Sequence, residues 1–224
     1  MADTTSKATG TFTIKGWDEQ PYAEAEGAAK LTHARVTTTY SGELEGEGRA
    51  FGIKFRPAGF RPFLGAPVST LTDRRAPVAE VFGPPGDDLV AALLAAPGDP
   101  ELAATAEAFL RDRLPDPDPN LALVNRVVDQ VMADRDITQV KHLTDRTGVG
   151  TRRLQRLFAT YTGVTPKWVI QRSRLHEAVE RLVHDNHIDL GFLARDLGYF
   201  DQAHFTRDFR ATVGHPPTTY ARSP

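Results

Sequence analysis

An internal repeat constrains the C-terminal part of this chain more strongly than any other feature of its sequence. Residues 137–168 resemble residues 188–219 at a constant offset of 51 residues. The matched pairs are Ile137 with Ile188, Asp145 with Asp196, Leu154 with Phe205, Arg156 with Arg207, Phe158 with Phe209 and Pro166 with Pro217. Such a pattern indicates one supersecondary unit that is used twice.

Each repeat predicts a short helix, a tight turn and a longer helix. In the first repeat, Gly148 can close a helix in the left-handed conformation, and Gly150 sits where the next helix is capped. In the second repeat, Gly198 ends the short helix, and Asp201 is a good N-cap for the longer one. This arrangement is the helix-turn-helix pattern. The helices are expected at about 138–146, 150–162, 166–184, 190–197 and 202–212.

The longer helix of each repeat has an apolar face and a polar face. The apolar residues of the first share a helical face and should be buried: Leu154, Leu157, Phe158 and Tyr161. In the second, Phe205 and Phe209 should be buried in the same way. The polar faces carry arginine and glutamine, which can make bidentate contacts with guanine and adenine, respectively. The candidate DNA-binding residues are Arg152, Arg153, Gln155 and Arg156 in the first helix and Gln202, Ala203, His204 and Arg207 in the second.

The chain ahead of the repeat changes character twice. Residues 1–48 are acidic and β-like: Phe12 and Ile14 alternate with polar residues, and KLTHARVTTTYSG is β-branched and ends at a Ser-Gly turn. Glu43, Glu45 and Glu47 are interpreted as a polar strand face rather than as catalytic carboxylates.

Residues 49–119 begin with a strand-like alternation, AFGIKF, and continue into a proline-rich stretch that excludes long helices. Residues 86–113 predict two Ala/Leu-rich helices with Asp87 and Asp99 as N-caps and Pro100 at a first helical position. The alternating prolines of residues 114–119 predict a stiff spacer, and we place a domain boundary there. Residues 120–224 then predict helices only.

Charge and cysteine content limit the classes of function that this chain can have. Residues 120–224 hold 15 lysines and arginines against 11 aspartates and glutamates, whereas the remainder holds 12 against 18. A basic half is a weak indication of a polyanionic partner. The chain has no cysteine, which excludes thiolate metal sites and the methyl-accepting thiolates of a DNA-alkyl-repair protein. The histidines of His184-Asp185-Asn186-His187 are interpreted as a loop, so no metal is expected.

Residues 120–224 resemble the AraC-type (AraC/XylS) transcriptional regulators. The segments GTRRLQRLFATYTGVTPKWV and LARDLGYFDQAHFTRDFRATVGHPPTTY are similar to the first recognition helix and the longer signature of that family. The resemblance implies two helix-turn-helix motifs joined by a linker helix, here 166–184. It also implies that all of the candidate residues except Arg153, which flanks them, reach bases or phosphates. Gly150 departs from the capping serine that is frequent in the family, and Ala203 could only touch a thymine methyl group.

Two shorter resemblances concern the N-terminal half. Residues 50–113 resemble the end of the N-terminal domain of one AraC-type subfamily, and residues 8–48 resemble the start of a small β-barrel family of unknown function. We therefore predict a mixed fold, in which an N-terminal β-rich partial domain is followed by an all-α domain. The expected domains are 1–48, 49–119 and 120–224.

The sequence thus predicts a sequence-specific transcription regulator that reads two adjacent major-groove segments with helices 150–162 and 202–212. We expect no catalytic residues and no cofactor, and a cytoplasmic location, because residues 1–10 contain no apolar run and no stretch is long enough to span a membrane. The expected partners are double-stranded DNA and, as a candidate, RNA polymerase; the sequence identifies no effector. The alternative is a small-ligand-binding or isomerase-like β-barrel protein with the helical domain as an accessory module.

Overall fold

The computed structural model describes residues 51–53, 55–73, 75–185 and 187–220, together with the backbone of three short strands nearer the N-terminus. β1 (Gly10–Ile14) pairs antiparallel with β3 (Tyr40–Leu44), and β2 (Leu31–His33) pairs antiparallel with β4 (Arg75–Pro77). The remainder of the predicted β-rich segment 1–48 lies outside the described residues.

The strand predicted around Phe12 is confirmed by β1, whereas the predicted Ser-Gly turn is wrong. Ser41 and Gly42 lie inside β3, where Gly42 is the partner of Phe12 in the β1–β3 register. The turn-forming tendency of a Ser-Gly pair is local, and ladder hydrogen bonds to β1 satisfy the backbone groups of this segment instead.

The first helices after the strands are short, because prolines recur until residue 85, and two longer helices follow them. The elements are α1 (Arg61–Leu64), the 3-10 helix η1 (Val68–Leu71), α2 (Val78–Phe82), α3 (Pro84–Ala95) and α4 (Asp99–Arg111). The strand predicted from AFGIKF is wrong for its described residues, since 51–53 and Phe55 lie in no strand, and Phe51 and Ile53 are exposed.

The two helices predicted over 86–113 are confirmed as α3 and α4, but their predicted N-caps are wrong. Gly83 and Gly98 occupy the cap positions, so Asp87 lies in the first turn of α3 and Asp99 is the first residue of α4. A proline in the first turn, whose fixed φ suits a helix, starts each of them earlier than an aspartate cap would. Both aspartates still favour the positive end of the helix dipole.

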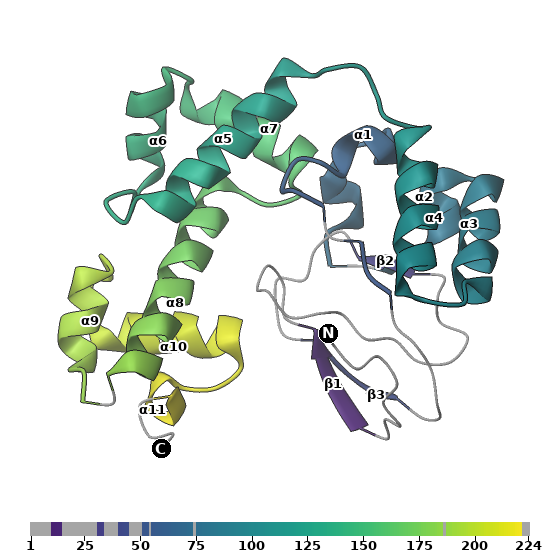
Figure 1. The fold of residues 1–224 in the computed structure, drawn as a ribbon. Coiled ribbons are helices and arrows are strands. Elements are labelled where there is room, and N and C mark those ends of the chain that lie inside the picture. The colour runs from purple at the N-terminus through teal and green to yellow at the C-terminus, as the bar shows by residue number, and fades with distance from the viewer. Residues whose placement is uncertain are drawn as a thin grey trace.

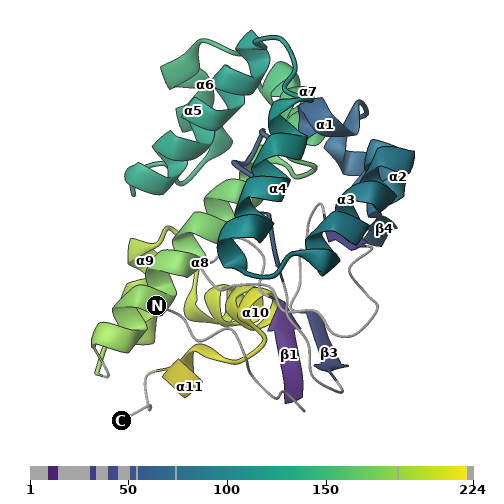
Figure 2. The ribbon, with the colours of Figure 1, turned by 45° about the vertical axis from the view of Figure 1, so that its right-hand side comes forward.

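The helices predicted for the C-terminal half are confirmed within a few residues as α5 (Pro119–Ala133), α6 (Val140–Thr147), α7 (Thr151–Tyr161), α8 (Pro166–His184), α9 (Leu190–Asp196) and α10 (Gln202–Val213). A further short helix, α11 (Pro217–Tyr220), was not predicted. We call the α6–α7 pair unit 1 and the α9–α10 pair unit 2. The long helix α8 runs from unit 1 to unit 2 (Figures 1 and 2).

Left-handed glycines end the helices at equivalent places in the two units. Gly148 closes α6 with a φ of 67°, and Gly198 follows α9 with a φ of 72°. Gly163 and Gly214, which follow α7 and α10, have positive φ as well. Because glycine lacks a Cβ atom, it adopts this conformation without steric cost, which allows each turn to be short.

Each unit has its own apolar core. Unit 1 packs on α5 and on the start of α8, with Leu143, Leu154 and Phe158 fully buried. Unit 2 packs on the end of α8 and on α11, with Leu193, Phe205 and Phe209 fully buried. All of the apolar residues predicted to be buried in α7 and α10 are therefore buried as expected.

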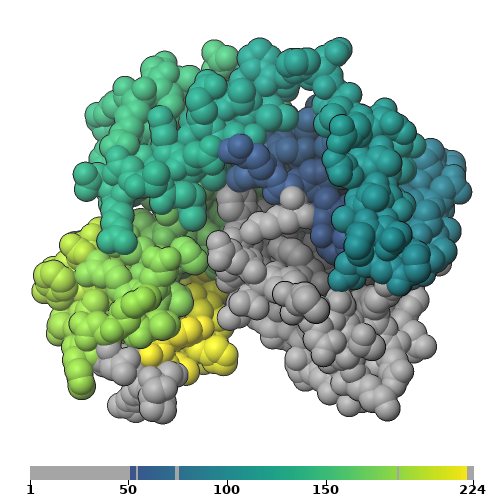
Figure 3. All heavy atoms as spheres, in the orientation of Figure 1, coloured from purple at the N-terminus to yellow at the C-terminus, as the bar shows by residue number. Residues whose placement is uncertain are grey.

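A segment from the N-terminal side of the proline spacer completes the core of unit 1. Ala58 is fully buried in that core, and its backbone N–H donates to Asn125 Oδ1 of α5 at 3.1 Å. The hydroxyl of Thr72, just after η1, donates to the Gly163 carbonyl at 2.9 Å. Figure 3 shows this segment, in blue, between α5 and the α3–α4 pair.

Within the described part of the chain, no helix is both long and apolar enough to cross a membrane.

Candidate nucleic-acid interface

The burial of α7 fixes which of its side chains point outward. Leu154, Leu157 and Phe158 anchor one face, so positions 152, 153, 155 and 156 are turned away from the core. The four predicted contact residues of this helix are all exposed: Arg152, Arg153, Gln155 and Arg156. The first helix of unit 1, α6, packs against α7 and α8 through its buried Leu143.

The corresponding helix of unit 2 is oriented in the same way by Phe205 and Phe209. Their ring centroids lie 5.5 Å apart, and Tyr220 of α11 extends the aromatic contact from Phe209 at 5.7 Å. The four predicted contact residues of α10 are again exposed: Gln202, Ala203, His204 and Arg207.

The exposed candidate arginines of these two helices have no ion-pair partner in the part of the chain that the structure describes. Among the residues that the structure describes, no carboxylate forms an ion pair with Arg152, Arg153, Arg156 or Arg207, whereas Arg146 and Arg181 are paired with Asp134 and Asp196. Unpaired cations on a helix face leave a positive field there, which attracts polyanions. Both units therefore present positive charge on the helix that follows the turn.

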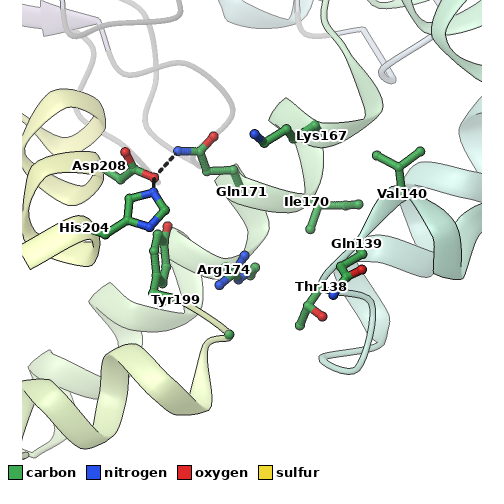
Figure 4. A pocket seen from close by; sticks show the side chains of 11 residues that line it. Thr138, Gln139, Val140, Lys167, Ile170, Gln171, Arg174, Tyr199, His204 and Asp208 are labelled. Carbon is green, nitrogen blue, oxygen red and sulfur yellow. Dashed lines mark hydrogen bonds and ion pairs between the residues drawn. The ribbon is translucent and has the colours of Figure 1, made fainter. Parts of the chain in front are cut away.

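His204 differs from the other seven candidates because it already has partners in the protein. Its ring meets the Tyr199 ring edge-on, with centroids 5.2 Å apart, and its Nε2 lies 3.5 Å from Asp208 Oδ2. The His204 side chain nevertheless remains 48% exposed. It lies at the edge of unit 2 that faces the start of α6, as Figure 4 shows.

The helices that carry these residues are capped differently. Asp201 accepts a hydrogen bond from the His204 backbone N–H at 2.7 Å and so caps α10. Gly150 occupies the same place before α7 and has no side chain to offer. Both caps lie at the positions that the sequence predicted.

A group of residues between the two units was not identified from the sequence. Arg174 of α8 stacks on the Tyr199 ring, with its Cζ 4.3 Å from the ring centroid, and burial lowers the pKa of its guanidinium. Burial likewise raises the pKa of Tyr199 to about 12, so its hydroxyl keeps its proton. Helical spacing could have indicated that Arg174 is buried. It follows the buried Ile170 by one helical turn and directly precedes the buried Leu175.

Two separate segments of the chain match known protein families. Residues 143–223 match a family described as "Helix-turn-helix domain", and residues 8–53 match one described as "Protein of unknown function (DUF3224)". The first match covers α7 to α11 and most of α6. The second covers the segment for which the sequence predicted a β-barrel family of unknown function.

Two curated relatives match a part of this chain. The transcriptional activator NphR of Rhodococcus sp. is 31% identical over 103 residues, which cover 46% of this chain and 30% of NphR. The uncharacterized HTH-type transcriptional regulator YidL of Escherichia coli (strain K12) is 34% identical over 70 residues, covering 31% of this chain and 23% of YidL. The chain thus spans less than a third of the length of these curated relatives.

Among solved structures, the xylose-binding transcription activator xylR is 16% identical, with a TM-score of 0.36. That alignment covers 67% of this chain and 40% of xylR. Agreement of overall shape is weak at this score, so the likeness rests on the sequence matches.

Proposed function

Because residues 143–223 form a helix-turn-helix domain of the AraC type, we propose that this chain is a sequence-specific DNA-binding transcription regulator. The observation that carries the proposal is the pair of equivalent helices, α7 and α10, each of which exposes arginine and glutamine opposite a fully buried core. AraC-type proteins are regulators and not enzymes, so no catalytic role is proposed. The named function of NphR, transcriptional activation, supports the same class.

The two units are proposed to enter two adjacent major-groove segments about 34 Å apart, one turn of duplex. Arg156 and Arg207 occupy equivalent places and are the proposed base readers, since the guanidinium fork matches O6 and N7 of guanine. The remaining six candidates supply further base or phosphate contacts from the same two faces: Arg152, Arg153, Gln155, Gln202, Ala203 and His204.

We propose that residues 120–224 are the DNA-binding domain and that 1–48 and 49–119 are separate segments before it. The contacts of Ala58 and Thr72 with unit 1 link 49–119 to that domain. A ligand that changed this N-terminal segment would act on unit 1 first. RNA polymerase remains a candidate partner, because a DNA-bound activator works by contacting it.

Selection of binding sites from a random duplex library with the purified chain tests the proposal. We expect enrichment of a site with two conserved blocks one helical turn apart, and binding that weakens steeply as salt rises, because phosphate contacts release counterions. An Arg111→Ala variant is the matched control, since Arg111 is an exposed arginine of α4 paired with Glu107, outside the proposed interface. Absence of both enrichment and salt dependence would contradict the proposal.

A further inference from the structure

A cavity of about 440 Å³ lies at the seam between the two units. Figure 4 shows residues 138–140, at the start of α6, on one side and Tyr199, His204 and Asp208 of unit 2 on the other, with α8 between them. The cavity is thus lined by both units and by the helix that joins them. None of its lining residues other than His204 belongs to the interface described above.

Three hydrogen-bond donors in this cavity have no acceptor among the residues that the structure describes. They are Arg174 Nε, Arg174 Nη2 and the Tyr199 hydroxyl, and all three are shielded from solvent. Tyr199 is only 6% exposed, and its ring stacks on the Arg174 guanidinium. Buried donors without acceptors are costly, and an oxygen ligand that enters the cavity would relieve that cost.

The charges around the cavity favour an anion. Lys167, Arg174 and His204 are the basic residues of its lining, and Asp208 is the one acid. The Asp208 carboxylate is already engaged, because it accepts a hydrogen bond from Gln171 Nε2 at 2.6 Å and lies 3.5 Å from His204 Nε2. The start of α6, whose cap residue Gln139 makes no side-chain hydrogen bond to the helix, adds the positive end of a helix dipole.

We propose that this seam cavity binds one phosphodiester group of the DNA backbone, between the two major-groove segments. The inference rests on the proposed function and adds to it a specific contact. In a helix-turn-helix motif the first helix crosses the DNA backbone, which puts the start of α6 beside a phosphate. The strand that leaves unit 1 for unit 2 passes the seam, where Arg174 and Tyr199 offer donors from a prearranged pair. One bound phosphate then ties both units to the same strand.

Neutral phosphate substitution tests the proposal without altering the protein. A duplex carrying the selected site is prepared with a single methylphosphonate moved through the backbone between the two conserved blocks. We expect one central position on one strand at which the substitution weakens binding of the full chain about 10-fold, because a charge-assisted contact is lost. Equal and small effects at every central position would overturn the inference.

Two variants then assign that contact to the cavity. Arg174→Met should remove the effect of the central methylphosphonate, and it should lower the slope of log K against log salt by about 0.9. Tyr199→Phe keeps the ring that supports Arg174 and removes only the hydroxyl, so it should weaken binding several-fold with the fold unchanged. Arg111→Ala is the control that should leave both readouts unaltered. If the central methylphosphonate weakens both variants as much as it weakens the unsubstituted chain, the phosphate lies elsewhere.

Free phosphate is the other source of the same ligand chemistry. Inorganic phosphate at millimolar concentration should leave the arginine and tyrosine resonances of the DNA-free chain unshifted, because a free ion lacks the further contacts by which both units hold a duplex at the cavity. Saturable shifts of Arg174 by inorganic phosphate would reassign the cavity to a free anion. A chain that binds no duplex at all would instead refute the proposed function, so the two failures are distinguishable.

Discussion

The two helix-turn-helix units share one backbone plan but differ in what completes their cores. Unit 2 is closed by residues near it in sequence: a chain of edge-to-face aromatic contacts runs from Tyr199 through Phe205 and Phe209 to Tyr220. Unit 1 instead takes Ala58 and η1 from the far side of the proline spacer. The repeated sequence therefore specifies the fold of each unit, whereas the elements that complete each core are specified by sequence outside the repeat.

This difference has a functional consequence. A change in the N-terminal segment can reach unit 1 through the hydrogen bonds of Ala58 and Thr72. Because both units are proposed to bind one DNA site, weakening unit 1 alone would lower affinity and leave unit 2 folded. The predictions below test how independent the units are, from the largest expected effect to the smallest.

The largest effect should come from truncating the equivalent core phenylalanines. Phe158→Ala and Phe209→Ala each remove a fully buried ring, and each should destabilise the chain by about 3–5 kcal/mol. Urea unfolding measures the loss, and hydrogen exchange locates it. We expect protection to fall first in unit 1 for Phe158→Ala and first in unit 2 for Phe209→Ala. Equal loss of protection in both units after either change would mean that the two clusters form one cooperative core.

The contact between Ala58 and unit 1 should be measurable through Asn125. Asn125→Ala leaves the buried N–H of Ala58 without an acceptor, so it should cost about 1–3 kcal/mol in the full chain. In a fragment that begins at residue 114, Ala58 is absent and the same substitution should be nearly neutral. We expect this fragment, which holds the predicted C-terminal domain, to fold on its own. Equal costs in the two backgrounds would show that the contact adds nothing to stability.

The proposed base readers offer a comparison at the level of DNA. Arg156→Ala and Arg207→Ala should each weaken binding to the selected duplex by about 1–3 kcal/mol and relax the sequence preference in one block only. Arg156→Ala should affect the block under unit 1, and Arg207→Ala the block under unit 2. Titrations with selected and random duplexes decide the outcome. A loss that is equal on both duplexes would make these residues phosphate contacts.

Features that depend on residues close in sequence could be predicted, whereas contacts between residues far apart in sequence could not. The helices, the left-handed glycines and the exposed faces depend on local spacing, so the residues of α7 and α10 could be assigned from sequence. The Ala58–Asn125 bond joins positions 67 residues apart, and nothing in either local sequence indicates the partner. Arg174 and Tyr199 were missed for a similar reason, since their contact depends on how α8 packs against the turn of unit 2.

The proline spacer shows the same limit. Residues 114–118 lie in no helix or strand, which agrees with their alternating prolines. The prolines do not indicate that the last aspartate of this segment is engaged. Asp118 caps α5 by accepting from the Asn120 N–H at 2.8 Å, and its carboxylate also accepts a hydrogen bond from the Tyr161 hydroxyl of α7. A segment that looks like a linker in sequence is therefore fixed to unit 1 at its end.

This carboxylate should make the stability of unit 1 sensitive to acid. The Tyr161 hydroxyl, followed by the backbone N–H of Asn120, lowers the pKa of Asp118 below its ordinary value. The stabilisation is therefore complete above the pKa of the unfolded chain and is lost as pH falls through the lowered folded-state pKa. Asp118→Asn should flatten the acid limb of a stability–pH profile and cost about 1 kcal/mol at neutral pH.

Asp201→Asn is the matched control, because Asp201 also caps a helix, α10 of unit 2, and asparagine caps a helix as well as aspartate does. It should change the stability at neutral pH by a few tenths of a kcal/mol at most. If Asp118→Asn alters neither the acid limb nor the neutral stability, then the bond to Tyr161 contributes nothing in solution.

The smallest expected effect concerns the cap that unit 1 lacks. Gly150 precedes α7 with φ and ψ of −62° and 149°, a conformation open to any residue, and a Cβ added there meets nothing within 4 Å. Gly150→Ser supplies a hydroxyl for a free N–H of the first turn and reduces the freedom of the unfolded chain, so it should stabilise unit 1 by about 0.5 kcal/mol. Gly148→Ser is the contrasting variant two residues away, where space is also open but φ is 67°. It should destabilise by about 1 kcal/mol, because a side chain is strained in the left-handed region. Thermal unfolding of the two variants separates capping from backbone strain, and a destabilising Gly150→Ser would mean that the start of α7 is held by contacts other than its cap.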